Sequence, residues 1–148
     1  MTKQIVCCLL AIASSIMMCA AMDQNVLMLK EVAMDLDRLE KSLQKGVMLH
    51  TPTNDIDECC SLSVLECFRG NVNLLQATQK KLQHKLFKKL MNPMIVSNMN
   101  FCTLEETQKA ICPPCNSYPK RNSEQFVKEL RLLLQKATAR LTWKQTRR

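Results

Sequence analysis

The spacing of its cysteines constrains this chain more than any other feature. Nine cysteines are present, three within the first 19 residues and six between positions 59 and 115. The last two form a Cys112-Pro113-Pro114-Cys115 step, shortly before a strongly amphipathic final segment. An even number of cysteines in a short chain outside the cytosol predicts disulfides, and six cysteines allow fifteen pairings. Composition and spacing leave the choice among these pairings open.

The first 21 residues are predicted to be a signal peptide. Lys3 supplies a basic start, Ile5 to Met18 is almost unbroken apolar chain, and Cys19-Ala20-Ala21 offers small residues for cleavage. The alternative is an uncleaved anchor, because the apolar stretch from Ile5 to Met22 approaches the ~18 residues that can span a membrane. No basic stop-transfer cluster follows it, which favours cleavage. We therefore expect a secreted, extracellular protein with six remaining cysteines.

Cleavage after residue 21 of the 148 leaves 127 residues, enough for one domain with a real core and too few for two. We place this domain at 22–143, with a basic, disordered tail at 144–148. Lys3 is the only charge lost, so the formal net charge falls from +8 to +7. A basic protein of this kind favours acidic partners.

Apolar spacing predicts an all-α fold. The chain has two glycines and no alternating run long enough to indicate a strand. A first helix is expected at 24–45, with Asp23 as its N-cap and Gly46 as its C-terminal cap.

Three further helices are expected along the chain. A short one at 60–68 would be interrupted by Gly70, a third would occupy 72–90, and the last would start at about residue 123 and end at Trp143. Long connections, 47–58 and 94–114, lie after the first and third helices. The positions expected to face the core are Leu29, Val32, Leu36, Leu39, Leu43, Leu65, Cys67, Phe68, Leu75, Gln79, Leu82, Leu86, Leu90, Phe126, Leu130, Leu133, Leu134, Ala137 and Leu141.

Three stretches of the chain resemble a known family. They are Cys60-x6-Cys67-Phe68, the run from Cys112-Pro113-Pro114-Cys115 to Asn116-Ser117-Tyr118, and Phe126 through Leu134-Gln135-Lys136. Together they resemble the interleukin-2/15/21 family of short-chain helical cytokines. Asp37-x-Leu39 in the first helix is similar too, whereas residues 70–111 align poorly. The resemblance covers about half of the mature chain.

The fold implied by this resemblance is a disulfide-clamped four-helix bundle with up-up-down-down topology. Two long connections and one short one are typical of that topology, in which parallel neighbours need a connection as long as a helix. Length alone also permits an ordinary up-down bundle.

The resemblance also implies two disulfides, Cys60 with Cys112 and Cys67 with Cys115. A Cys-x2-Cys step and a Cys-x6-Cys step are compatible with two nearly parallel bridges. Cys59 and Cys102 depart from the family pattern. They are left as a candidate third bridge, as free thiols, or as the source of an intermolecular link.

The function implied is that of a secreted, monomeric cytokine that bridges the interleukin-21 receptor, a class I cytokine receptor, and the common gamma chain. Pairing their cytoplasmic tails would activate Janus kinase/STAT signalling in immune cells. Gln135 matches the glutamine with which the family contacts the gamma chain. Thr138 stands at the next contact position, where the family has an apolar residue.

For the specific receptor, the resemblance implies the first and third helices. Lys30 and Asp37 match a basic and an acidic family position, and the third helix is basic as in the family, with Lys80, Lys81, Lys85, Lys88 and Lys89. The ordinary alternative for such a charge run, and for Gln135, is a solvated helix face.

A catalytic or metal-binding function is not indicated. Cys112 and Cys115 invite a redox interpretation, but such a site usually lies in a βαβ setting. The Cys-x6-Cys spacing does not match common zinc sites, and His50 and His84 are isolated in the sequence. We expect no enzyme, no metal and no cofactor.

The main rival function is that of a cationic amphipathic host-defence protein that acts on membranes. It requires an exposed apolar helix face, whereas a cytokine bundle buries that face and does not insert into a membrane. Nucleic acid is disfavoured as a partner because aromatic residues are not interleaved with the lysines.

Overall fold

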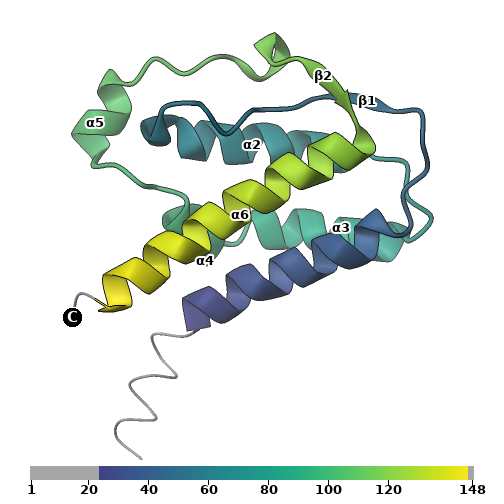
Figure 1. Ribbon diagram of the computed structural model, residues 1–148, viewed down its shortest axis with the longest axis horizontal. Coiled ribbons are helices and arrows are strands. Elements are labelled where there is room, and N and C mark those ends of the chain that lie inside the picture. Colours follow the sequence, from purple (N-terminus) through teal and green to yellow (C-terminus); the bar gives the residue numbers. More distant parts are fainter. Residues whose placement is uncertain (1–23, 147–148) are drawn as a thin grey trace, which may run out of the picture.

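The computed structural model describes residues 24–146 of the protein, and the predicted signal peptide and Asp23 lie outside them. The described chain is mostly helical, with a small sheet and three disulfides (Figure 1). Its long elements are a first helix over residues 24–40, unlabelled in Figure 1, then α2 (Ser61–Val72), α3 (Lys80–Leu90) and α6 (Ser123–Thr146). The short elements are β1 (Met48–His50), η1 (Glu58–Cys60), α4 (Pro93–Asn98), α5 (Leu104–Lys109), η2 (Cys115–Ser117) and β2 (Lys120–Asn122).

The first helix buries the face that its apolar spacing predicts, with Leu29, Leu36 and Leu39 fully buried. It ends at residue 40 and not at 45, because the backbone turns back there: the amides of Ser42 and Leu43 donate to the carbonyls three residues earlier. Gly46 is therefore not its cap. Gly46 has φ +120° in the loop beyond the helix, a conformation that favours glycine.

The predicted boundary between the second and third helices is wrong. Gly70 does not interrupt α2, which continues through it to Val72. Gly70 is exposed, and its absence of a side chain weakens a helix without breaking it. Residues 73–79, assigned to the third helix from sequence, form the connection instead.

Helix α3 starts at Lys80 because one of its own side chains bonds to the backbone of the preceding connection and keeps that connection out of the helix. The Gln83 side-chain amide is buried and donates to the carbonyls of Val72 and Leu75, each at 2.8 Å. Leu75 is buried as expected but lies outside the helix, whereas Gln79, expected to face the core, is exposed.

The chain is not all-α, since β1 and β2 form a two-stranded antiparallel sheet. Leu49 lies opposite Arg121 at its centre. Three-residue strands are too short to produce an alternating pattern, and no periodic signal in the sequence predicts them. α4 and α5 are six-residue helices that overlap the stretch expected to be a connection. They are too short for an apolar period, but Asn92-Pro93 and the capping box of Thr103 and Glu106 are helix-start signals that the sequence does contain. The sheet joins the connection after the first helix to the start of α6.

The core lies between the long helices, and α6 supplies much of it. Phe126, Leu130 and Ala137 are fully buried along its predicted apolar face, and the Phe126 ring meets Phe68 of α2 edge to face at 5.3 Å. Burial of each such side chain contributes roughly 1.5–3 kcal/mol to folding. Helix α6 continues to Thr146, past Trp143 and into the segment expected to be a disordered tail, of which residues 147–148 lie outside the described chain.

Candidate functional site

Three disulfides join the region around α2 to the long connection before α6. Two are the pairs implied by the family resemblance, Cys60–Cys112 and Cys67–Cys115. The third joins Cys59 to Cys102, one of the arrangements that the sequence left open. Cys112 and Cys115 are thus each bonded to a different cysteine in or next to α2, and not to one another.

The neighbouring residues Cys59 and Cys60 hold both ends of one segment, residues 102–112, which we call the tethered segment. Its helix, α5, has no buried residue, and a capping box between Thr103 and Glu106 caps its N-terminus. Leu104 is 73% exposed and Ile111 is 95% exposed. The tethered segment is therefore fixed covalently and not by a core of its own.

Cys59, Cys102 and Glu106 are the one group of three potential metal donors that lies close together among residues 24–146. Both sulfur atoms belong to the Cys59–Cys102 disulfide. Metal ions bind cysteine as thiolate, so this group cannot hold a metal while the disulfide is intact.

On α6, the two predicted gamma-chain contacts lie in different settings. The Gln135 side chain is exposed. Thr138 is half-buried, and its hydroxyl donates to the carbonyl of Leu134 at 2.8 Å, within its own helix. Only Gln135 presents its polar group outward.

On the first helix, Lys30 is exposed, whereas Asp37 already has a partner inside the protein. The Asp37 carboxylate accepts hydrogen bonds from the Arg131 guanidinium of α6 at 3.0 Å (Nε) and 2.7 Å (Nη2). Arg131 also bonds Glu40. Burial lowers the pKa of Arg131, but the hydrogen bonds to Glu40 and Asp37 outweigh it and raise that pKa above its ordinary value. Asp37 thus joins the first helix to α6.

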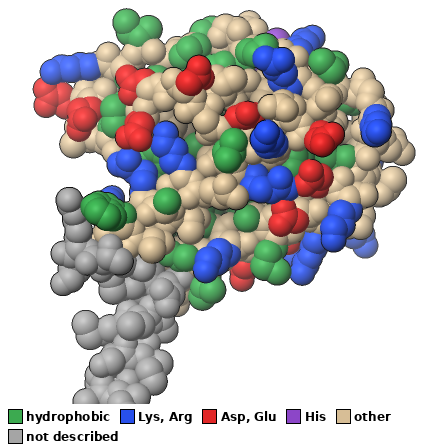
Figure 2. Space-filling model, viewed as in Figure 1, with side chains coloured by type: hydrophobic (Ala, Val, Ile, Leu, Met, Phe, Trp, Pro, Cys, Tyr) green, Lys and Arg blue, Asp and Glu red, His purple; other side chains and the backbone are tan. Residues whose placement is uncertain are grey.

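The Asp37–Arg131 pair lies within a mixed surface, which we call the first-helix/α6 face. Leu27, Lys30 and Met34 lie at helical steps of three and four residues along the first helix and are exposed; Leu132 and Gln135 flank Arg131 on α6 and are exposed as well. Figure 2 shows hydrophobic side chains interspersed with basic and acidic ones over these two helices. Single exposed apolar side chains are normal on a protein surface. This face is therefore a candidate binding surface because of the residues that the resemblance implies, and not because of its apolar content.

The five lysines of α3 divide into two groups. Lys80, Lys81, Lys85 and Lys88 are exposed. Lys89 is half-buried and lies 2.6 Å from a carboxylate oxygen of Asp35 in the first helix, and Asp35 is only 3% exposed. Lys89 therefore neutralises a buried charge, a role that the charge run in the sequence does not reveal.

Three of the exposed lysines, Lys81, Lys85 and Lys88, line an open groove. It has a volume of about 510 Å³ and is lined by Lys81, His84, Lys85, Lys88, Lys89 and Asn92. The His84 ring stacks against Phe87 at 6.5 Å between centroids. We call Lys80, Lys81, His84, Lys85 and Lys88 the α3 basic face.

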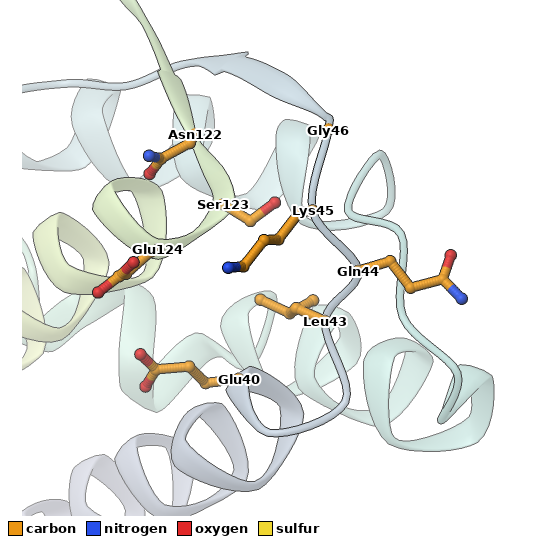
Figure 3. Close-up of a pocket in the computed structure, with 8 residues that line it drawn as sticks. All are labelled: Glu40, Leu43, Gln44, Lys45, Gly46, Asn122, Ser123 and Glu124. Atoms are coloured by element: carbon orange, nitrogen blue, oxygen red, sulfur yellow. The ribbon is translucent and has the colours of Figure 1, made fainter.

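A second pocket, of about 400 Å³, lies where the loop after the first helix meets the start of α6 (Figure 3). Lys45 points from the loop into it, between Ser123 and Glu40. The Ser123 hydroxyl is buried and has no hydrogen-bond partner among the described residues. The pocket joins residues about 80 positions apart in sequence, and no motif signals it.

The remaining histidine, His50, supports the sheet. Its Nδ1 donates to the carbonyl of Tyr118 at 2.8 Å. Tyr118 is buried, its hydroxyl has no partner among residues 24–146, and burial raises its pKa above 10.0. Both groups lie near the junction of β1 and η2.

Three disulfides within the described chain are typical of a protein that folds outside the reducing cytosol. Across residues 24–146, the helices are all too short or too polar to cross a membrane. No model of a known protein family matches the chain, and no curated protein matches it in sequence.

Proposed function

We propose that this protein is a secreted cytokine of the interleukin-2/15/21 family, similar to interleukin-21, that bridges the interleukin-21 receptor and the common gamma chain. The observation that carries the proposal is the pair of disulfides Cys60–Cys112 and Cys67–Cys115, formed by the same cysteines whose spacing bears the resemblance. In this proposal the protein acts by binding alone: it brings two receptor tails together, and Janus kinases and STAT proteins carry the signal in immune cells.

The proposed architecture is the up-up-down-down bundle. Long connections over 41–60 and 91–122 flank a short one over 73–79, as that topology requires. In Figure 1 the first helix and α2 run from left to right, and α3 and α6 run from right to left, which also supports it. Two different sides of such a bundle are free to contact two receptors.

We assign the gamma chain to the first-helix/α6 face around Gln135. An exposed glutamine between exposed apolar side chains offers a hydrogen-bonding group that becomes desolvated on binding, and a few such residues dominate most interfaces. The specific receptor is assigned to the α3 lysines 80, 81, 85 and 88. Lys30, which the resemblance implies for that receptor, lies on the first-helix/α6 face instead. Lys89 and Asp37 contribute by fixing the helices, since each has a partner within the protein.

The substitution Gln135→Asp tests the gamma-chain assignment. It places an unpaired charge at a desolvated contact, which costs several kcal/mol and should reduce signalling more than 100-fold. Signalling is measured as STAT phosphorylation in cells that express both receptor chains. Binding to the isolated interleukin-21 receptor and the far-UV spectrum should not change.

Gln108→Asp is the matched control, because Gln108 is an exposed glutamine on α5, outside both assigned faces. It should signal normally. Full signalling by Gln135→Asp would reject the assigned face, and lack of response from the unsubstituted protein in these cells would reject the receptor pair.

The burial of the α6 apolar face favours the cytokine proposal over the host-defence alternative. Phe126, Leu130 and Leu134 are at most 1% exposed, so the folded protein has no free apolar stripe on this helix to place in a lipid surface. Leakage of anionic vesicles at low concentrations of the folded protein would support the alternative instead.

A further inference from the structure

The charges in the first half of α3 oppose the stability of the helix, whereas Lys88 and Lys89 in its last turn suit the helix dipole. Lys80 and Lys81 occupy the first turn, where the helix dipole favours acidic residues, and α3 contains no acidic residue. Lys81 and Lys85 are four residues apart, as are Lys85 and Lys89, and like charges at this spacing repel. A sequence selected for stability alone would mix the signs here. The arrangement therefore points to a negatively charged ligand.

These charges are also available to such a ligand. Within the described chain, no salt bridge involves Lys80, Lys81, Lys85 or Lys88. The nearby carboxylates of Glu31 and Asp35 lie within 4 Å of Lys89 and occupy that lysine, and no acidic residue lines the groove.

The geometry selects a linear polyanion. Lys81, Lys85 and Lys88 follow one face of the helix and span about 10 Å along its axis at 1.5 Å per residue. We propose that the α3 basic face binds a sulfated polysaccharide of the heparan sulfate type. Such a chain repeats its sulfate groups along its length, and it occurs in the extracellular setting that the three disulfides indicate.

Other polyanions fit this face less well. Binding within a lipid surface needs apolar side chains beside the cations, but Leu86 and Leu90 are fully buried and Phe87 is half-buried. Single-stranded nucleic acid needs exposed aromatic rings on which bases stack, but the exposed positions of α3 carry no Phe, Tyr or Trp, and the His84 ring is stacked against Phe87. The polysaccharide binds through charge and hydrogen bonds alone, which is what the face offers.

This interaction goes beyond receptor pairing. Binding through α3 would retain the protein at cell surfaces or in the matrix near the secreting cell. It would also compete with a receptor that uses the same lysines.

The test is binding of the folded, fully oxidised protein to immobilised heparin, for the wild type and for the triple variant Lys81→Gln, Lys85→Gln, Lys88→Gln. Affinity at low salt should fall roughly 100-fold, since each cation at an anionic surface contributes about a factor of five. The slope of log affinity against log salt should decrease by roughly three, the number of lost cation contacts. Heparin stripped of its sulfates should bind weakly to the wild type.

The control is a variant with the same loss of charge elsewhere, at the exposed residues Lys41, Lys120 and Lys128, each changed to Gln. It should lose less than fivefold in affinity. An equal loss in both variants would show that net charge alone attracts heparin, and would overturn the proposal. Stronger binding to phosphatidylserine vesicles than to heparin would also overturn it, in favour of a lipid surface.

Thermal unfolding separates binding from folding. The triple variant should unfold at about the same temperature as the wild type, because removal of the repulsion between Lys81 and Lys85 offsets the loss of the Lys88 charge from the C-terminal turn. A lower unfolding temperature would show that the lysines serve the fold, contrary to the proposal. The proposed receptor function is read separately, as STAT phosphorylation in cells that lack heparan sulfate.

Discussion

At the scale of single residues, burial decides which charged side chains serve the fold and which remain available. Asp35 is nearly inaccessible to solvent, and a buried carboxylate needs a cationic partner. Lys89 supplies it at 2.6 Å, while Lys85, one turn earlier, remains exposed. In the sequence the two lysines look alike, because nothing in α3 itself shows that the first helix places a carboxylate beside only one of them.

Substitution of Lys89 by Gln should therefore destabilise the protein, while Lys85→Gln should not. Loss of Lys89 leaves Asp35 with the more distant Arg38, at 3.7 Å, as its remaining cationic neighbour. We expect a loss of about 1–3 kcal/mol in the free energy of unfolding, below the full cost of breaking a buried pair because Lys89 is partly exposed. Lys85→Gln should stay within about 0.5 kcal/mol. Urea denaturation measures both, and equal effects would contradict the structural role of Lys89.

Tyr118 provides a second residue-scale prediction, because its buried hydroxyl has no partner within residues 24–146. Tyr118→Phe removes an unsatisfied polar group and should leave stability at pH 7 within about 1 kcal/mol of the wild type, or increase it.

The raised pKa of Tyr118 adds a dependence on pH. The unfolded chain releases this proton near pH 10.0 while the folded chain still holds it, so the wild type should lose stability relative to Tyr118→Phe as pH rises above 10. Tyr118 is the only tyrosine in the chain, so tyrosinate absorbance of the native protein reports its titration directly. A native titration at or below pH 10 would contradict the effect of burial.

At the scale of elements, periodic spacing predicted the long helices and missed the places where tertiary contacts set their ends. The buried faces of the first helix and α6 follow the expected positions, because each runs over several turns and repeats its apolar residues. Residues 73–79 continue that apolar pattern and yet form a connection, in which Gln83 satisfies the carbonyls of Val72 and Leu75. A glutamine that reaches back to a preceding turn leaves no periodic signal.

The contribution of each disulfide to stability depends on which of the other disulfides are present. A bridge that closes a loop of 43 residues on its own would contribute about 4 kcal/mol by the chain-entropy estimate. Because Cys60–Cys112 already brings the same regions together, Cys59–Cys102 closes a ring of only about a dozen residues and should contribute about 3 kcal/mol.

The double substitution Cys59→Ala, Cys102→Ala tests this estimate by denaturation under non-oxidising conditions that leave the other two bridges intact. The loss should approach 4 kcal/mol only in a protein that lacks both Cys60–Cys112 and Cys67–Cys115, because either bridge shortens the ring that Cys59–Cys102 closes. If the double variant lost no stability with both other bridges present, native strain or residual structure would have to offset the entropy term.

At the scale of the whole molecule, the sequence indicated candidate residues but not how they combine into surfaces. Gln135 and the exposed lysines of α3 lie on the surface as the family resemblance implies. No sequence signal indicated their apolar neighbours, Leu27, Met34 and Leu132, or the pocket at Lys45. Both features depend on how the first helix packs against α6. The receptor assignment stays a prediction that the Gln135 experiment decides.

The adjacent anchors at Cys59 and Cys60 determine what happens when a protease cuts the outermost part of the protein. Lys109 is exposed at the end of α5, and hydrolysis of the bond after it by trypsin would divide the backbone between two cross-linked positions. Brief digestion should yield a species heavier by one water molecule that migrates as one band without reductant and as two with it. Because the core helices lie outside the cut segment, the clipped form should remain folded and keep its potency in the STAT assay; early separation of the pieces without reductant would refute the bridging pattern.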